Sequence, residues 1–220
     1  MRNFFNIDSP IMQKLSLFGT LIMMNVVWLI CCIPIVTVGA STAAMYRVMF
    51  DLREDKNCRW VDFFRYFRDN FKQSTLLWLI YLLVAVVLYL LFCLISWIGI
   101  GNLARALLLI PFFLLFFLWF FSLHYCFALS AFFENTLKNT LINAAAMSLR
   151  HLRQTVVCSA LTLLPFVFGM VSLYWLLALG YIWLFVYPGF SFYWKSGLIR
   201  KVFANYAPSF EQDTQDSEEE

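Results

Sequence analysis

Charged side chains are scarce in this chain, and long stretches lack them altogether. Only 13% of the 220 residues are Asp, Glu, Lys or Arg, whereas about a quarter of a soluble domain is charged. From Val156 to Trp194 the chain runs for 39 residues without one. A water-soluble core cannot absorb so much apolar surface. The composition therefore excludes an ordinary soluble protein and predicts an all-α, polytopic membrane protein.

The sequence also lacks the motifs of common catalytic and metal sites. It contains no C-x-x-C pair, no glycine-rich phosphate loop, no G-x-S-x-G elbow and no H-E-x-x-H helix. Of its cysteines, Cys58 falls on the predicted cytoplasmic side, where disulfides are rare, and the others lie in or near apolar runs. We therefore expect no enzymatic activity, no metal, no cofactor and no nucleic-acid partner.

The apolar runs divide into helices of membrane-crossing length. Ser74–Ile98 holds 25 residues, which as a helix exceeds the roughly 30 Å hydrocarbon core of a bilayer. The 39-residue run fits two helices with a turn near Leu179 and Gly180. The predicted spans are residues 15–35, 41–53, 74–98, 106–133, 156–176 and 178–194. They form one bundle over residues 1–201, and residues 202–220 are expected to be a disordered, acidic, cytoplasmic tail.

Basic residues orient the bundle, because Lys and Arg near span ends concentrate on the cytoplasmic side. Seven of them lie between Arg47 and Lys72. If the short stretch 41–53 crosses, there are six crossings and the N-terminus is inside; if it only re-enters, there are five. Six crossings place 15 of the 16 basic residues inside, which favours that arrangement. Arg47 lies one turn before Asp51, so the two side chains could then pair at the membrane boundary. A signal peptide fits less well, since the first apolar run is too long.

Two predicted cytoplasmic helices, residues 60–72 and 135–154, are amphipathic. Their polar side chains include Arg65, Arg68 and Lys72 in the first and Asn135, Asn139 and Asn143 in the second. Basic and aromatic residues suit helices that lie on the lipid surface as elbows. Asparagines have no obvious use against lipid, so one of the two helices is also a candidate docking surface for a cytoplasmic partner, with these six residues as its possible contacts.

Helix-breaking residues coincide between Pro34 and Gly39, where Thr37 adds a hydroxyl. Broken helices line substrate paths in transporters, although kinks that improve packing are more common. His124 lies well inside the span 106–133 and is expected to hydrogen-bond across the bundle. Pro34, Thr37, Gly39 and His124 are therefore candidates for a substrate path or a structural break. No acidic residue lies in the middle of a predicted long span, which argues against a cation-coupled carrier.

Two adjoining stretches are distinctive: WLICCIPIVTVGASTAAMYRVMFDLRED (Trp28–Asp55) and WVDFFRYFRDNFKQSTLLW (Trp60–Trp78). The spacing of Trp, Pro, Thr, Gly, Thr-Ala-Ala and Tyr, followed by FFRYFRDNFKQ, resembles the YesL family of bacterial integral membrane proteins. The resemblance implies a multi-pass protein of the bacterial plasma membrane. The basic residues after the last span, Lys195, Arg200 and Lys201, predict a cytoplasmic C-terminus. Family members are often encoded beside components of carbohydrate ABC importers, but no binding or catalytic residue carries over.

The position of these genes beside importer genes implies an accessory or regulatory role in oligosaccharide import, with the importer's permease or ATPase subunits as partners. The alternative is a small transporter or channel in its own right, with its path near the Pro34–Gly39 segment. A membrane enzyme ranks third, because no set of acid, base and nucleophile is visible. Oligomeric state and ligand do not follow from the sequence.

Overall fold

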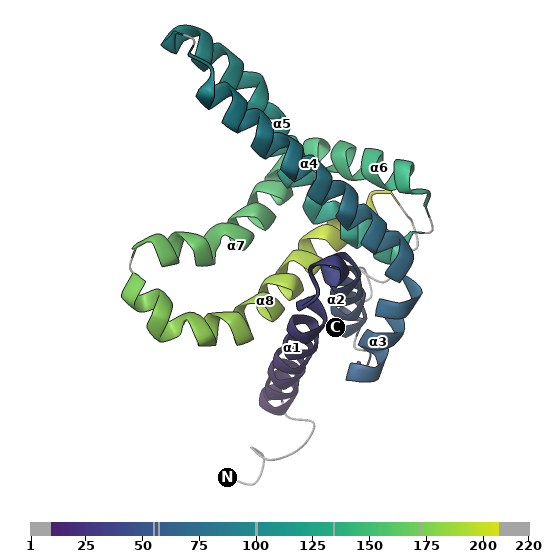
Figure 1. Cartoon of the computed structure of the whole chain (residues 1–220). Helices are drawn as coiled ribbons and strands as arrows, with labels where there is room; N and C mark the ends of the chain where they lie inside the picture. The colour runs from purple at the N-terminus through teal and green to yellow at the C-terminus, as the bar shows by residue number, and fades with distance from the viewer. Residues whose placement is uncertain are drawn as a thin grey trace.

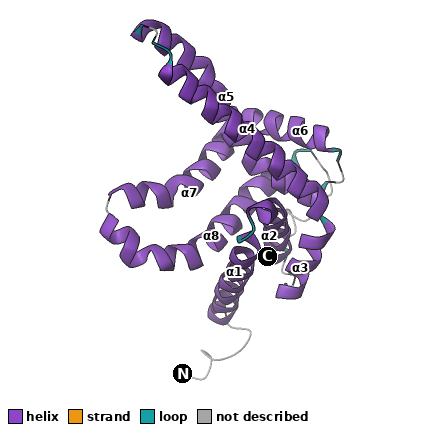
Figure 2. Ribbon diagram, in the orientation of Figure 1, coloured by secondary structure: helices purple, strands orange, loops and turns teal. Residues whose placement is uncertain are grey.

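A computed structural model shows a chain of helices connected by short turns, and the residues that it describes include no strand (Figures 1 and 2). These are residues 10–206 other than 55, 57, 100, 134 and 172, without the side chains of 10, 11, 168–179 and 181–183. The elements are α1 (Pro10–Cys32), the 3₁₀ turn η1 (Ile35–Thr37), α2 (Val38–Arg53), α3 (Trp60–Asp69), α4 (Phe71–Trp97), α5 (Asn102–Phe132), α6 (Leu137–Arg150), α7 (Leu152–Val171) and α8 (Leu173–Ala204). The acidic residues from Glu211 onward, which are predicted to belong to a disordered tail, lie outside the described residues.

Three described helices are long and apolar enough to cross a membrane: Met12–Cys32 within α1, and the whole of α4 and α5. Most of the predicted spans 156–176 and 178–194 coincide with α7 and α8, but many of their side chains lie outside the described part. The prediction of an all-α protein with several membrane-spanning helices is confirmed to this extent. The number of crossings stays a prediction.

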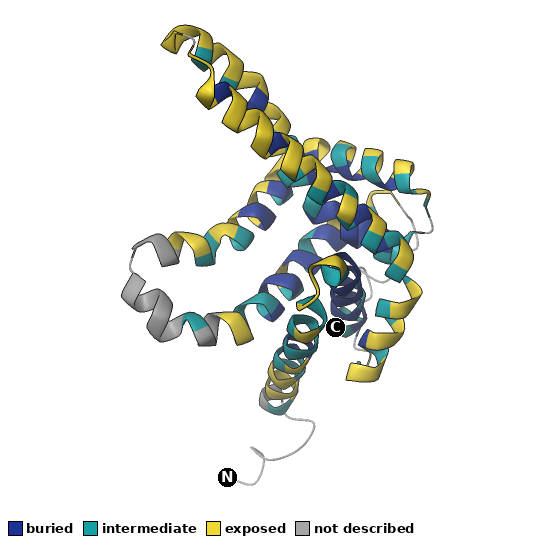
Figure 3. Ribbon diagram, viewed as in Figure 1, coloured by how far each residue is buried: buried dark blue, intermediate teal, exposed yellow. Residues whose placement is uncertain are grey.

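Helices α4 and α5 form an antiparallel hairpin that projects away from the other helices (Figure 1). Toward its tip, Leu88, Ile95 and Phe112 form a small buried cluster of their own. Most other residues there are exposed and are coloured yellow on the ribbon in Figure 3. An apolar surface of this extent would drive aggregation in water. It is suited to the hydrocarbon core of a bilayer.

Helix α2 is the centre of the main hydrophobic core. Its small residues, such as Ala43 and Ala44, are fully buried and allow neighbouring helices to approach closely. At its start Gly39 lies against Phe127, and near its end the Phe50 ring lies 4.2 Å from that of Phe132. Both ends of α2 thus contact the same end of the α4–α5 hairpin. The stretch predicted as a short span therefore lies across the hairpin, covered by protein.

Prolines within α7 and α8 are accommodated by specific hydrogen bonds. Proline leaves the carbonyl four residues earlier without its helical donor. The freed carbonyl of Leu184, four residues before Pro188, accepts a hydrogen bond from Asn25 Nδ2 at 3.0 Å. Likewise the carbonyl of Leu161, four residues before Pro165, accepts from a tyrosine hydroxyl on α8. Polar side chains inside the bundle therefore complete the backbone of broken helical turns.

Two predicted boundaries in the C-terminal half are corrected by the structure. The turn expected near Leu179 and Gly180 lies earlier, because α7 ends at Val171 and α8 begins at Leu173. Glycine is tolerated inside membrane helices, so Gly180 does not end one. At the other end, α8 continues beyond the predicted bundle end at residue 201. Val202 and Phe203, assigned to the tail, are buried in the main core.

Candidate functional site

A pocket of about 300 Å³ opens where the ends of α5 and α8 meet α6. Its lining residues are Leu129, Phe133, Asn135, Asn143, Ala146, Met147, Arg150 and Tyr206. The end of α5 contributes the apolar side chains of Leu129 and Phe133. The polar groups around them are the amides of the two asparagines, the guanidinium of Arg150 and the phenol of Tyr206. No acidic side chain is among the described residues of the lining, and these residues suit an apolar group that lies next to a carboxylate or another hydrogen-bond acceptor.

Helix α6 contributes four of these residues, and Ala146 is one of them. Asn143, Met147 and Arg150 are spaced four and three residues apart and therefore share one helical face. The helix begins with a capped first turn, in which the Thr136 hydroxyl accepts from the backbone N–H of Asn139 at 3.4 Å. The adjacent face of α6 is buried and includes Thr140, Ala144 and Ser148, and α6 packs against α5. The polar face is thereby left toward the pocket.

The predicted asparagine stripe is only partly brought together. Asn135 and Asn143 line the pocket, but Asn139 is exposed outside it. The pocket lies toward the C-terminal half of α6, beside Tyr206, whereas Asn139 is in the first turn of the helix. The backbone carbonyl of Asn135 also accepts a hydrogen bond from Gln73 Nε2 at 2.8 Å, which ties the start of α4 to the α5–α6 connection.

Two polar residues of the pocket, Arg150 and Tyr206, were missed by the sequence analysis. Arg150 shares the α6 face with Asn143, so helical periodicity would have found it. No local pattern indicates Tyr206, which reaches the pocket only through the fold. Its hydroxyl lies 3.2 Å from His151 Nε2, and the two rings meet edge to face. This contact holds the end of α8 against the α6–α7 corner.

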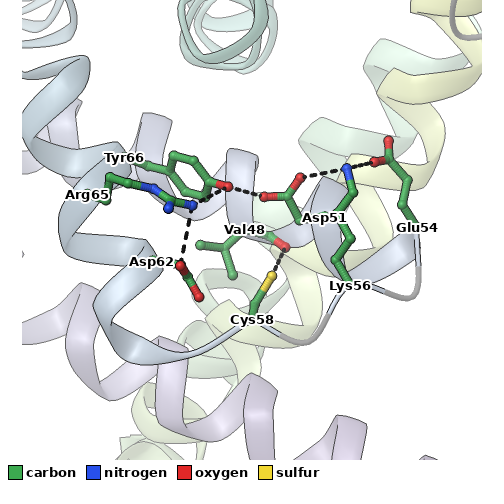
Figure 4. Close-up of polar contacts among 8 residues, drawn as sticks. All are labelled: Val48, Asp51, Glu54, Lys56, Cys58, Asp62, Arg65 and Tyr66. Atoms are coloured by element: carbon green, nitrogen blue, oxygen red, sulfur yellow. Dashed lines mark hydrogen bonds and ion pairs between the residues drawn. The ribbon is translucent and has the colours of Figure 1, made fainter.

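A second polar group joins α2 to α3 (Figure 4). The buried carboxylate of Asp51 accepts a hydrogen bond from the Tyr66 hydroxyl at 2.6 Å and pairs with Lys56 at 3.6 Å. Lys56 also pairs with Glu54, and Arg65 contacts both Asp62 and Tyr66. The pairs involving Lys56 and Arg65 have exposed partners and stabilise little. The Tyr66 contact satisfies a buried charge and matters more.

The expected pairing of Arg47 with Asp51 is wrong. The Arg47 guanidinium lies over the rings of Phe132 and Tyr66, at 4.5 and 5.7 Å from their centroids. Stacking of this kind lets a half-buried guanidinium remain against an apolar surface. Asp51 is left to Tyr66 and Lys56, so the polar corner is closed by α3 and the α2–α3 connection.

Burial shifts the pKa values of two groups at this corner. It raises the pKa of the Cys58 thiol to about 11, with a smaller contribution from the negative charge of Asp51. Burial also raises the pKa of Tyr66, and its hydrogen bond to the Asp51 carboxylate adds to the shift. Both groups therefore stay protonated and neutral near neutral pH, as a closed structural corner requires.

The basic residues predicted as a docking set, Arg65, Arg68 and Lys72, are all exposed. They lie on α3 and the first turn of α4 and do not line the α6 pocket. Their aromatic neighbours divide: Phe63 is buried in the core, whereas Trp60 and Phe64 are exposed. This is the distribution of a helix at a membrane surface, as the amphipathic pattern predicts.

The Pro34–Gly39 break is closed by hydrogen bonds and packing. Thr37 Oγ1 contacts the carbonyl oxygens of Cys31 and Pro34 at 2.6 and 2.8 Å, and Trp78 Nε1 donates to the Ile35 carbonyl at 2.7 Å. These contacts supply donors to backbone that the interrupted helix leaves unpaired. These hydrogen bonds are those of a structural turn, and the role of the segment in a substrate path stays a prediction.

Within the described part of the chain, His124 does not make the interhelical hydrogen bond expected of it. Its side chain is buried in α5, and its ring meets that of Phe120 edge to face at 5.4 Å. Its Nε2 atom has no hydrogen-bond partner among the described residues. Nor do these residues include a group of three His, Cys, Asp or Glu side chains that would hold a metal.

Residues 21–92 match the family described as "Protein of unknown function, DUF624". The matched segment includes the Pro34–Gly39 break and the Asp51–Tyr66 corner, and it ends before the α6 pocket. It also covers most of the residues that carry the resemblance to YesL proteins. Neither curated proteins nor solved structures gave a match. The comparisons thus associate the N-terminal third with a family whose function is unknown.

Proposed function

We propose that this is a non-enzymatic protein of the bacterial plasma membrane that assists or regulates a carbohydrate ABC importer. It does so by docking a permease or ATPase subunit on its cytoplasmic side. The observation that carries the proposal is the α6 pocket, in which Asn135, Asn143 and Arg150 surround an apolar floor. The importer as partner rests on the resemblance to the YesL family, and the docking role rests on the pocket itself.

The chemistry of the pocket specifies the docking segment. Its apolar floor accommodates one aliphatic or aromatic side chain, and Arg150 favours a neighbouring carboxylate. Asn143 can both donate to and accept from the backbone of an entering segment. We therefore expect a short cytoplasmic segment of the partner with an apolar residue next to Asp or Glu. The closed Pro34–Gly39 turn gives no comparable support to a transport path.

Affinity purification of the tagged, full-length protein from its own membranes in mild detergent tests this function. The wild type should retain permease or ATPase subunits, and Asn143→Ala or Arg150→Ala should lower their recovery about tenfold, as loss of roughly 1.4 kcal/mol of binding would. Asn139→Ala is the matched control, because it removes the same exposed amide from the same helix outside the pocket. It should leave recovery unchanged.

Membrane abundance must be measured beside recovery. If Asn143→Ala reduces both in parallel, its effect is on folding and the docking role fails. Equal recovery of importer subunits by all variants would contradict the pocket as the docking site. Absence of these subunits from the wild-type sample would contradict the importer itself.

A further inference from the structure

The C-terminal end of the described chain lies at the rim of the α6 pocket. Its last residue, Tyr206, lines the pocket, and the backbone N–H of this residue donates to the Phe203 carbonyl at 2.9 Å. The Tyr206 hydroxyl lies 3.2 Å from His151 Nε2, so contacts hold both the backbone and the side chain of the tyrosine. The residues that follow Tyr206 in the sequence therefore start beside the pocket.

The charges on the two sides of this junction are opposite. Residues 135–210 contain no Asp or Glu, and the exposed cations on α6 and the first turn of α7 are Lys138, Arg150 and Arg153. None of the ion pairs found in the described residues involves Arg150, which lines the pocket. Residues 211–220, by contrast, carry six acidic side chains and no basic one. An exposed guanidinium of the pocket thus has carboxylates available within the same chain.

The residues shortly after Tyr206 match the segment that the chemistry of the pocket specifies. Phe210 is followed directly by Glu211, which is an apolar residue next to a carboxylate. Phe210 comes four residues after Tyr206, and an extended chain of that length spans up to about 14 Å. Because Tyr206 itself lines the pocket, this span is long enough for the Phe210 ring to reach the apolar floor formed by Leu129 and Phe133.

We propose that the Phe210 ring occupies the α6 pocket and that the Glu211 carboxylate pairs with Arg150. The tail is then an intramolecular competitor of the partner's docking segment, a regulatory role that rests on the proposed function. A short connection gives such a tail an effective concentration in the millimolar range, so even a weak contact is substantially occupied. A partner segment therefore docks only by displacing Phe210.

Disulfide crosslinking in the purified full-length protein tests whether the tail occupies the pocket. In a cysteine-free background, Ser209→Cys places a thiol beside Phe210, and Ala146→Cys places one in the pocket lining. Their intramolecular crosslink should form about tenfold faster than the crosslink between Ser209→Cys and Asn139→Cys. Asn139 is the matched control because it is exposed on the same helix outside the pocket.

Further substitutions in the tail separate the contribution of the ring from that of the charge. Phe210→Ala should slow the pocket crosslink about tenfold, whereas Phe210→Leu should keep most of the rate because its side chain stays apolar. Glu211→Gln should slow it about threefold, the effect of losing one exposed ion pair with Arg150. Thr214→Ala, which lies outside the apolar–acidic pair, should leave the rate unchanged.

Two crosslinking results would overturn the proposal. The first is an equal rate with and without Phe210→Ala, which would show that the ring is not held in the pocket. The second is a crosslink that joins two copies of the chain, which would assign the tail to a neighbouring molecule.

Recovery of importer subunits tests the competitor role with the native cysteines in place. Phe210→Ala should raise recovery about threefold above the wild type, because it removes the competing ring, whereas Asn143→Ala lowers recovery. Unchanged recovery by Phe210→Ala, when the wild type retains the subunits, would contradict competition. Absence of the subunits from every sample would contradict the importer as partner, and the crosslinking rates would still decide whether the tail occupies the pocket.

Discussion

Gly39 is a residue whose missing side chain brings α2 against α4 and α5. A Cβ at this position would lie 2.6 Å from Trp78 Cβ and would also meet the backbone oxygen of Ser74. Gly39→Ala should therefore destabilise the protein by about 1–3 kcal/mol, the usual cost of overpacking. Gly19→Ala is the control, since nothing lies within 4 Å of its added Cβ. That variant should be neutral or slightly stabilising.

Thermal unfolding of both variants in the same detergent measures the difference. The sequence marked Gly39 as a helix breaker, which explains the turn that precedes it but not its main structural role. That role depends on the neighbouring helices, because only the fold shows what occupies the space beside the glycine. Equal melting temperatures for Gly39→Ala and Gly19→Ala would contradict the close approach of α2 and α4.

At the scale of single residues, the reactivity of the Cys58 thiol should also depend on pH. Its folded pKa of about 11 lies above the value of a free thiol, so the reactive thiolate is scarce in the folded protein. In a variant that keeps only this cysteine, maleimide labelling at pH 8 should be about 100-fold slower than in the urea-unfolded chain. The rate should rise through pH 10–11. The protonated thiol stabilises the fold fully below the unfolded pKa, and this contribution is lost as the pH rises through 11.

At the scale of elements, Asn25 links α1 to the interrupted turn of α8. Its amide donates a hydrogen bond to the Leu184 carbonyl, which Pro188 leaves unpaired, and another to the Phe185 carbonyl at 2.7 Å. Asn25→Ala should destabilise the protein by about 1–2 kcal/mol. In a Pro188→Ala background the helix supplies the missing donor itself, so the same substitution should cost less. A double-mutant cycle by thermal unfolding measures the coupling, and strictly additive effects would contradict it.

Helices were more predictable than the contacts between them. Apolar runs such as Ser74–Ile98 predict helices because charge is excluded from them over a bilayer's thickness, and α4 agrees within a few residues. The boundary between α7 and α8 was misplaced because Gly180 ends helices in water but not in lipid. The central position of α2 could not be predicted, since its short and only moderately apolar sequence carries no sign of what surrounds it.

At the scale of the whole molecule, the pocket and the burial of Lys195 depend on residues far apart in sequence. The asparagine stripe indicated a polar surface on α6, but Tyr206 completes the pocket from the other end of the chain. Lys195 was expected on the cytoplasmic side because it follows the last apolar run; the structure shows that α8 continues past it and that its side chain is buried. Charge order along the chain predicts sidedness, whereas burial depends on neighbouring helices.

Sidedness itself leads to a prediction for the whole molecule. Asn102 lies at the tip of the α4–α5 hairpin and Asn139 on α6, and both are exposed. In a cysteine-free background, Asn102→Cys should react with a membrane-impermeant maleimide on intact cells, and Asn139→Cys only after permeabilisation, because the basic segments are held inside. Asn6→Cys should behave like Asn139→Cys if there are six crossings. Labelling of Asn6→Cys from outside would contradict six crossings. Equal labelling of Asn102→Cys and Asn139→Cys on intact cells would contradict the orientation on which the α6 docking site depends.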